Sequence, residues 1–431
     1  MSFRITNSML SSNYLRNVKR NMNNMQTLQN QLASGKEINK ASDNPYVASR
    51  SMQLNAEISY NKQYDENIKD TSNWLDTTDT ALSQMGSIFG RIETLLVNAG
   101  NGTYGDDEKS AIKDEIKEKV NELSQVLNTS FDGSYIFGGT KTNSKPTTVV
   151  DGKLEYADKD GNFINVYKQS NGTITTSATT SNISYTLTAS DITLLNSELN
   201  NTTSPPSDAR KTEINTLILA GVGASEYKSV DGTITTSATS TNKQVGLTMA
   251  DVTALQNELN NTTSPPNAAR KNEINNILTQ ATPITQINSS LEVDITQGVK
   301  SIYNKTAVDV LEFKDKNGKS INVSDLLSNI VNDLGTNGSG SNLITNDLND
   351  IQSVTANLLQ KRSEVGTMQN RMDSAQTNNE TQNYNMTDIL SKTEDVDFAN
   401  KTMEYSMMQT VYTASLQTSA KILPMTILNY L

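Results

Sequence analysis

The chain has 431 residues, of which 35% are hydrophobic and only 5% aromatic, a composition more common in elongated helical assemblies than in compact enzymes. Its formal net charge of -11 disfavours nucleic acid as a partner, because most of the surface would repel phosphate. The chain contains no Cys and no His, which excludes a thiol nucleophile, a Ser–His–Asp triad, an imidazole base and any Cys- or His-liganded zinc. We therefore assign no catalytic residues, no metal site and no cofactor.

A first helix is predicted over residues 4–34, because apolar residues recur there at the spacing of a heptad repeat. Only Gln29 is out of place in this pattern. The apolar positions are Leu15, Val18, Met22, Met25 and Leu32. They predict a face that packs on another helix.

A joint between two helices is predicted just after this track. Gly35 fits a C-terminal cap, since Gly adopts positive φ without strain. Asn44 and Pro45 fit the N-cap and the first position of a second helix. The candidate joint residues are Leu32, Gly35, Ile38, Asn39, Asp43, Asn44 and Pro45.

The second and third helices are predicted over residues 45–99 and from Asp106 to about Leu127. The second carries apolar residues separated by seven positions or multiples of seven, at Leu54, Ile68, Leu75, Leu82, Phe89 and Leu96. Asp106, Asp107 and Glu108 favour the start of the third, since the helix dipole stabilises negative charge there. Short turns between long helices indicate a bundle.

The centre of the chain changes to a strand pattern. Residues 131–143 predict a hairpin or a bent strand with Gly corners, and residues 147–187 are rich in Thr, Val, Ile and Tyr between Asp-Gly turns. A duplication with a constant offset of 60 residues follows, since Gly172-Thr-Ile-Thr-Thr-Ser-Ala-Thr recurs at Gly232. Each copy, about 167–220 and 227–280, is predicted to hold a strand, a turn and two short helices. We interpret it as a duplication in a surface region that tolerates insertion.

Heptads return near the C-terminus. Their core positions are Ile344, Ile351, Leu358, Val365 and Met372. A polar stretch from Thr377 to Asn385 predicts an interruption, after which a last helix is expected over about 387–422. Its candidate packing residues are Val396, Met403, Leu416 and Leu423.

These patterns predict a mainly α fold with a β-rich insertion. The N- and C-terminal helices are expected to pair as an elongated rod or coiled coil, with an α+β central domain that contains the duplication. The expected domains are a terminal coiled coil, a helical rod and a central insertion. They are assigned to residues 1–42 with 386–431, 43–140 with 340–385, and 141–339.

Three stretches resemble a known family. They are Leu32-Ala-Ser-Gly-Lys-Glu-Ile-Asn-Lys-Ala-Ser-Asp-Asn-Pro45, Glu394-Asp-Val-Asp-Phe-Ala399 and Leu416-Gln-Thr-Ser-Ala-Lys-Ile-Leu423. They resemble the terminal signatures of the flagellin superfamily, over roughly residues 4–140 and 340–431. Within the superfamily, three segments look more like junction proteins between hook and filament than like flagellin. They are Ser42-Asp-Asn-Pro45, Ser134-Tyr-Ile-Phe-Gly-Gly-Thr-Lys-Thr142 and the ending Ile427-Leu-Asn-Tyr-Leu431.

The resemblance implies a structural subunit that forms a homo-oligomeric ring between another hook-associated junction protein and flagellin. It also implies export by the flagellar type III apparatus, with an export chaperone, to an extracellular location on the bacterial flagellum. No cleavable signal is visible, and no run approaches the ~18 apolar residues of a membrane span, so we expect no membrane insertion.

We hypothesise that the terminal helices stay frayed in the monomer and become ordered when neighbouring subunits cover them. Three alternatives remain open. Paired carboxylates in the centre could serve a glycosidase, the Thr- and Ser-rich insert could bind glycans or surfaces, and the chain could be flagellin itself.

Overall fold

The chain divides into two units. The computed structural model describes residues 7–100, 105–168, 173–176, 183–186, 189–201, 205–220, 225–228, 234–235, 243–334 and 346–427. The first unit contains residues 1–70, 294–301 and 371–431, and the second contains residues 71–293 and 302–370.

Long helices dominate both ends of the sequence. These are α1 (Asn7–Ser34), α2 (Pro45–Ala99), α3 (Asp106–Leu127), α12 (Leu348–Glu394) and α13 (Phe398–Ile427). Shorter helices occur between them: α4 (Ala189–Leu199), α5 (Asp208–Ala220), α6 (Met249–Leu259), α7 (Ala268–Gln280), α8 (Thr282–Ile287), α9 (Ala307–Leu311) and α10 (Val323–Asp333). The expected fold class, mainly α with small antiparallel sheets in the centre, is confirmed.

The strands form small sheets. Four pairs are antiparallel hairpins: β1 (Ser130–Phe131) with β2 (Ser134–Tyr135), β3 (Thr147–Val150) with β4 (Lys153–Tyr156), β11 (Glu292–Thr296) with β12 (Val299–Ile302), and β13 (Glu312–Lys314) with β14 (Ser320–Asn322). Two three-stranded sheets have the orders β10-β5-β6 and β7-β8-β9. Their strands are β5 (Asn165–Lys168), β6 (Ile174–Thr175), β7 (Ile183–Thr186), β8 (Ser225–Lys228), β9 (Ile234–Thr235) and β10 (Lys243–Gly246).

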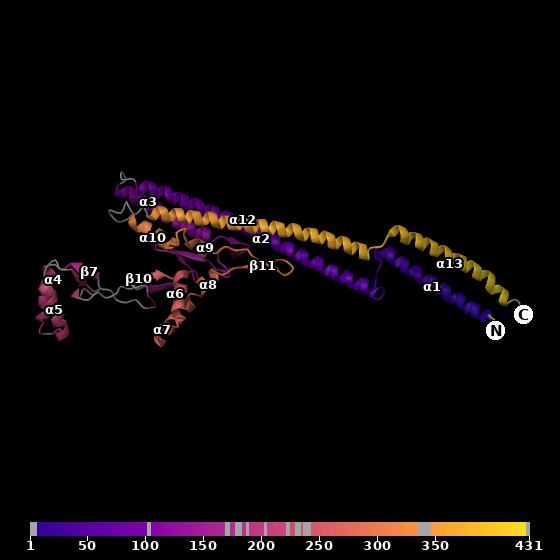
Figure 1. The fold of residues 1–431 in the computed structure, drawn as a ribbon, viewed down its shortest axis with the longest axis horizontal. Helices are drawn as coiled ribbons and strands as arrows, with labels where there is room; N and C mark the ends of the chain where they lie inside the picture. Colours follow the sequence, from indigo (N-terminus) through magenta and orange to yellow (C-terminus); the bar gives the residue numbers. More distant parts are fainter. Residues whose placement is uncertain are drawn as a thin grey trace. The chain divides into compact units, whose positions relative to one another are not determined.

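In the first unit, α1 and α13 run antiparallel along each other, so the start of α1 and the end of α13 lie at the same end of this pair (Figure 1). The first part of α2, the last part of α12 and most of the β11–β12 hairpin complete the unit. Leu54, Ile68, Met372 and Ile295 are buried within it. The first two and Met372 are heptad positions predicted from the sequence.

The polar stretch from Thr377 to Asn385 does not interrupt the helix, so this prediction was wrong. The helix α12 continues to Glu394, and α13 begins only at Phe398 rather than near residue 387. Asn379 is 1% exposed and its Nδ2 donates to the carbonyl of Ile295 at 2.8 Å. Asn383 donates to the carboxylate of Asp65 in α2 at 3.3 Å. The two amide nitrogens therefore find partners on β11 and on α2, which a hydropathy pattern cannot reveal.

The second unit has the larger apolar core. Heptad residues of α2 and α12 are buried there, each with at most 1% of its surface exposed. They are Leu75, Leu82, Phe89 and Leu96 of α2 and Ile351, Leu358 and Val365 of α12. Ile344, a further predicted heptad position, lies outside the described residues. Arg362 of α12 binds Asp79 of α2 through two nitrogens, at 2.9 and 3.0 Å. The heptad pattern thus identified the core of this unit correctly.

The Gly138-Gly139 pair that follows β2 is fixed by close packing on α8. A Cβ at Gly139 would lie 2.3 Å from the carbonyl oxygen of Gln286, and Thr140 donates its N–H to the same oxygen at 3.0 Å. Ile136 and Phe137 just before the pair are fully buried. No side chain larger than hydrogen fits at this position without moving the α8 backbone.

The third strand of each repeat copy pairs with a strand of the other copy. The 60-residue offset relates β5 to β8, β6 to β9 and β7 to β10. However, β5 pairs with β6 and with β10, while β8 pairs with β9 and with β7. Each sheet therefore contains two strands of one copy and the third strand of the other.

Candidate functional site

The joint between the helices is built by two short linkers that meet in the first unit. The N–H of Glu37 donates to the carbonyl of Glu394 at 2.7 Å, and the N–H of Val396 donates to the carbonyl of Gly35 at 3.0 Å. Lys36 and Asp395 form an antiparallel bridge between these bonds. The linkers 35–38 and 394–397 therefore form a two-stranded bridge, although they are separated by more than 350 residues in the sequence.

Local caps set the direction of the N-terminal linker. Gly35 has φ of +71° and its N–H donates to Gln31 at 2.9 Å, as predicted for a C-terminal cap. Asp43 accepts the N–H groups of Asn39 and Lys40 at 3.3 and 2.9 Å, which closes the turn. These three predicted joint residues thus have defined roles.

The helices that follow the linkers are also capped. Asn44 Oδ1 accepts the N–H of Val47 at 3.3 Å, and Pro45 is the first residue of α2, where its missing N–H costs nothing. Asp397 accepts the N–H groups of Ala399 and Asn400 at 3.0 and 3.1 Å at the start of α13.

Glu394 is the charged centre of the joint. Its carboxylate is ion-paired with Lys36 and accepts the hydroxyl of Ser51 at 2.7 Å. The hydrogen bond from Lys36, together with that from Ser51, lowers the pKa of Glu394 although partial burial opposes the shift. The pair therefore connects both linkers to the first turns of α2.

One face of α1 packs against one face of α13. On α1 the less exposed positions follow a spacing of four and three, at Tyr14, Val18, Asn21, Met25, Leu28 and Leu32. On α13 they are Lys401, Tyr405, Met408, Tyr412 and Ser415. Of these eleven residues only Leu28 is buried, and the others are half-buried. Tyr14 donates its hydroxyl to the carbonyl of Ser415. The pair therefore has a thin core.

Apolar side chains also lie outside this contact. Leu15 and Met22 are 59% and 49% exposed on α1, and Met403 and Met407 are 63% and 66% exposed on α13. Val411 and Leu416 are exposed as well. Met403, Met407 and Val411 are four residues apart, which places them on one face of the helix. We call these three residues the methionine stripe.

The predicted terminal packing residues therefore separate into different groups. Val18 and Met25 are half-buried, whereas Leu15, Met22, Met403 and Leu416 are exposed. The predicted joint residues Leu32 and Ile38 are also half-buried. Val396 is buried, but in the joint rather than along the terminal pair. The side chain of Leu423 lies outside the described residues.

Sequence reasoning missed several residues of this region. Leu28 is the buried residue, next to the Gln29 that the expected track placed in the contact. Phe398 lies against Gly35, with its Cζ 3.6 Å from where a Cβ would be. The ion pair of Lys36 and Glu394 could not be found from spacing, because the two residues lie in different linkers.

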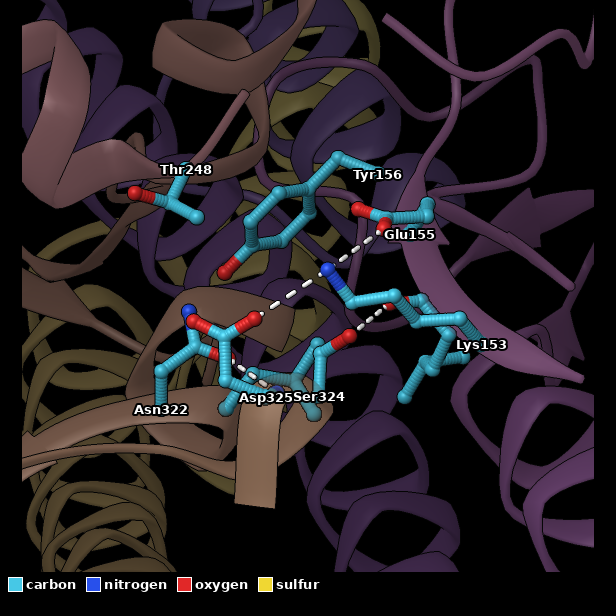
Figure 2. A pocket seen from close by; sticks show the side chains of 9 residues that line it. Lys153, Glu155, Tyr156, Thr248, Asn322, Ser324 and Asp325 are labelled. Atoms are coloured by element: carbon cyan, nitrogen blue, oxygen red, sulfur yellow. Dashed lines mark hydrogen bonds and ion pairs between the residues drawn. The ribbon is translucent and has the colours of Figure 1, made fainter. Parts of the chain in front are cut away.

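A small pocket in the second unit is lined by Lys153, Leu154, Glu155, Tyr156, Thr248, Leu311, Asn322, Ser324 and Asp325 (Figure 2). Lys153 Nζ lies 3.0 Å from Glu155 and 3.1 Å from Asp325, in the middle of the group. Burial raises the pKa of Glu155, and Lys153 only partly offsets this. Lys153 therefore links β4 to the start of α10 through these two carboxylates.

Within the residues that the structure describes, no group of three or more acidic side chains could hold a metal ion. None of the described helices combines the length and apolar character that spanning a bilayer requires.

The sequence matches two family models of bacterial flagellin. Residues 5–142 match the N-terminal helical region and residues 348–431 match the C-terminal helical region, together more than half of the chain. The chain belongs to the flagellin superfamily. Neither flagellin region extends into residues 143–347, which contain the duplication.

Individual members of the superfamily are similar to different extents. Flagellin of Clostridium tyrobutyricum is 25% identical over 403 residues, which is 93% of this chain and 94% of that protein. Flagellar hook-associated protein 3 of Salmonella typhimurium is 26% identical over 157 residues, 36% of this chain and 50% of that protein. The solved structure of hook-associated protein 3 from Legionella pneumophila aligns with 79% of this chain and 98% of its own, at 14% identity and a TM-score of 0.38.

Replacement of Gly35 by Val should destabilise the joint. A β-branched residue at positive φ costs on the order of 1–2 kcal/mol, and the helix cap is lost with it. Asn tolerates this conformation, so Gly35→Asn is the matched control and should retain most of the stability. Hydrogen exchange of the amides of residues 35–38 measures the effect. Equal protection in the Val variant and the parent protein would contradict this role of Gly35.

Glu394 should stabilise the joint in a pH-dependent way. Because its folded pKa is lowered, its contribution is complete above the ordinary pKa of 4.5 and is lost as the pH falls through the folded value. Glu394→Gln should therefore lower the melting temperature near neutral pH and have a vanishing effect in acid. Glu404→Gln is the control, since the exposed Glu404 pairs only with Lys401 of its own helix. A melting difference that persists at low pH would refute the assignment.

Proposed function

We propose that this chain is a structural subunit of the bacterial flagellum, located where the hook meets the filament, and not an enzyme. The observation that supports a flagellar role most directly is the pair of helices α1 and α13 with apolar side chains left exposed, in regions that match the flagellin termini. Such a pair is incomplete by itself and suits a subunit of an assembly.

Assignment to the junction rests on sequence likeness at the joint and after α3. Ser42-Asp-Asn-Pro45 and Ser134–Thr142 resemble junction proteins, and the match to hook-associated protein 3 of Salmonella typhimurium agrees with this. That match covers only half of the relative. Flagellin is the second candidate, favoured by the alignment with the Clostridium tyrobutyricum protein over nearly the whole chain.

The proposed mechanism is assembly through the exposed sides of the terminal pair. Among the side chains of the α1–α13 contact that the structure describes, one is buried, so these gain little from burial, and isolated helices are marginal in water. Burial of one Met or Leu side chain against a neighbour contributes about 1.5–3 kcal/mol, which offsets the entropy of ordering the helices. Residues 1–42 and 386–431 then act as one adhesive element, and residues 43–140 with 340–385 as the supporting rod.

The partners follow from this location. The subunits would form a ring with neighbours of the same kind, in contact with another hook-associated protein on one side and flagellin on the other. We further propose that an export chaperone covers the terminal helices before assembly, and that the chain is exported without a cleavable signal peptide. The Thr- and Ser-rich centre remains open to a role in glycan or surface binding.

Immunogold labelling of native flagella tests the location. A junction protein should give a single band between hook and filament and a low copy number relative to flagellin. Labelling along the whole filament, with thousands of copies, would instead identify the chain as flagellin. Absence from purified flagella would overturn both assignments.

Assembly through the methionine stripe has a separate test. Met403→Glu combined with Met407→Glu should reduce incorporation into flagella, because two charges would face a neighbouring subunit. Hydrogen exchange should show α1 and α13 protected in assembled material and weakly protected in the monomer. Ser406→Glu with Gln409→Glu adds the same charge on another exposed face and should assemble normally. Full protection of both helices in the monomer would count against the mechanism.

A further inference from the structure

The duplicated centre offers each sheet two candidates for its third strand. β7 and β10 occupy equivalent positions in the two copies, 60 residues apart. The sheet of β5 and β6 could pair with β7, the next strand in the chain, or with β10, which lies beyond the whole second copy. The structure has β10 in this position, with Val245 opposite Val166, and β7 opposite β8, with Tyr185 opposite Glu226.

This exchange makes the copies nested rather than consecutive. β5, β6, β10, α6 and α7 form one complete module, and residues 183–242 are inserted between its second and third strands. The insert contains its own set of the same elements: β7, α4, α5, β8 and β9. Pairing a strand with its nearest neighbour closes a shorter loop and is entropically favoured, so some other contact must select the distant strand.

The ion pairs that hold the two helices of a module together are present in both copies. Arg270 binds Glu258 through two nitrogens, at 2.7 and 2.9 Å, and Glu273 at 2.8 Å. Arg210 makes the same contacts with Glu198, at 2.8 and 2.9 Å, and with Glu213, at 2.8 Å. These contacts therefore cannot discriminate between β7 and β10.

Gly246 at the end of β10 is different from its counterpart. Its backbone lies so close to the carboxylate of Glu155 in β4 that a Cβ would be 1.6 Å from Oε2. The equivalent residue of β7 is Thr186, which has a Cβ. Thr186 therefore cannot replace Gly246 unless Glu155 leaves its position.

Glu155 is held in that position. It is buried, and its carboxylate lies 3.0 Å from Lys153, which is itself 3.1 Å from Asp325 (Figure 2). Removing Glu155 from this arrangement would leave Lys153 with a weaker partner in a partly buried site. A displaced carboxylate would give up the ion pair with Lys153 and the hydrogen bond from the backbone N–H of Gly246.

A second contact fixes the chain just beyond Gly246. Glu312 of β13 accepts the N–H groups of Met249 and Ala250 at 2.8 and 2.9 Å, at the start of α6, and the hydroxyl of Tyr156 at 2.9 Å. A carboxylate at a helix N-terminus is stabilised by the helix dipole. The strand that ends beside Glu155 must therefore lead directly into this helix start. This contact fixes the register of β10 against β5, with Gly246 beside Glu155.

We propose that Gly246 selects β10 over β7 as the partner of β5, and thereby makes residues 183–242 a nested module instead of the second of two consecutive ones. The same selection would act between subunits. In an assembly with many copies of the chain, β7 of one subunit would be rejected by the β5–β6 sheet of another, because Thr186 meets Glu155 there as well.

Engineered disulfides in the full chain test the proposal cleanly, since the natural sequence contains no Cys. Directly opposed residues of antiparallel strands have Cα atoms about 4.5–5.5 Å apart, within the range of a disulfide. Val166→Cys with Val245→Cys should cross-link in most molecules, and so should Tyr185→Cys with Glu226→Cys. Val166→Cys with Tyr185→Cys is the matched pair for consecutive modules and should remain largely reduced.

The role of Gly246 is then measured in the same chains. Gly246→Thr should decrease the Val166–Val245 cross-link and increase the Val166–Tyr185 cross-link. Adding Glu155→Ala, which removes the obstructing carboxylate, should restore the first cross-link, and this rescue distinguishes a steric effect from general misfolding. Efficient cross-linking of Val166→Cys with Tyr185→Cys in the parent chain, an unchanged pattern in the Gly246→Thr variant, or no rescue by Glu155→Ala would overturn the proposal.

Discussion

The two backbone hydrogen bonds between the linkers at Gly35 and Glu394 are the constraint on which the terminal part of the protein depends. They bring together segments from opposite ends of the sequence and fix where α1 and α13 begin to run along each other. The cap at Gly35, the cap at Asp397 and the ion pair of Lys36 with Glu394 all act within a few residues of these bonds. Among the described residues of the α1–α13 contact, all except Leu28 are only half-buried. The joint therefore holds the two helices in place more firmly than their own contact does.

Both the terminal pair and the second unit carry heptad patterns of apolar residues, but these residues are buried to different extents. In the second unit the heptad residues of α2 and α12 are fully buried, and Arg362 and Asp79 add a two-point ion pair. In the terminal pair the contact is thin, and a second set of apolar residues remains at the surface. The first pattern suits a stable support and the second suits a surface that another chain completes. This contrast within one sequence underlies the proposed role as a flagellar subunit.

Polar groups decide the structure where the apolar pattern is weak. The amide nitrogens of Asn379 and Asn383, in the polar stretch of α12, donate to Ile295 and Asp65, and the carboxylates of Glu155 and Glu312 organise the central region. Glu155 and Glu312 hold the end of β10 and the start of α6, and Gly246 fits there because it lacks a side chain. Such groups are costly to bury without partners, so each one ties together segments that are distant in the sequence.

The sequence by itself determined the helices α1, α2 and α3, the caps at Gly35 and Asn44, the buried heptad residues of α2 and α12 and the existence of the duplication. All of these depend on local geometry and on regular spacing, which a chain carries in one dimension. Only the tertiary structure decided that α12 passes through the polar stretch, that Leu28 rather than its neighbour is buried, that Leu15 and Met403 lie at the surface, and that the repeat copies exchange strands. A constant offset of 60 residues is the same for consecutive and nested copies, and backbone hydrogen bonds do not distinguish two equivalent strands. The choice depends on a contact between Gly246 and a distant carboxylate, which exists only once the chain has folded.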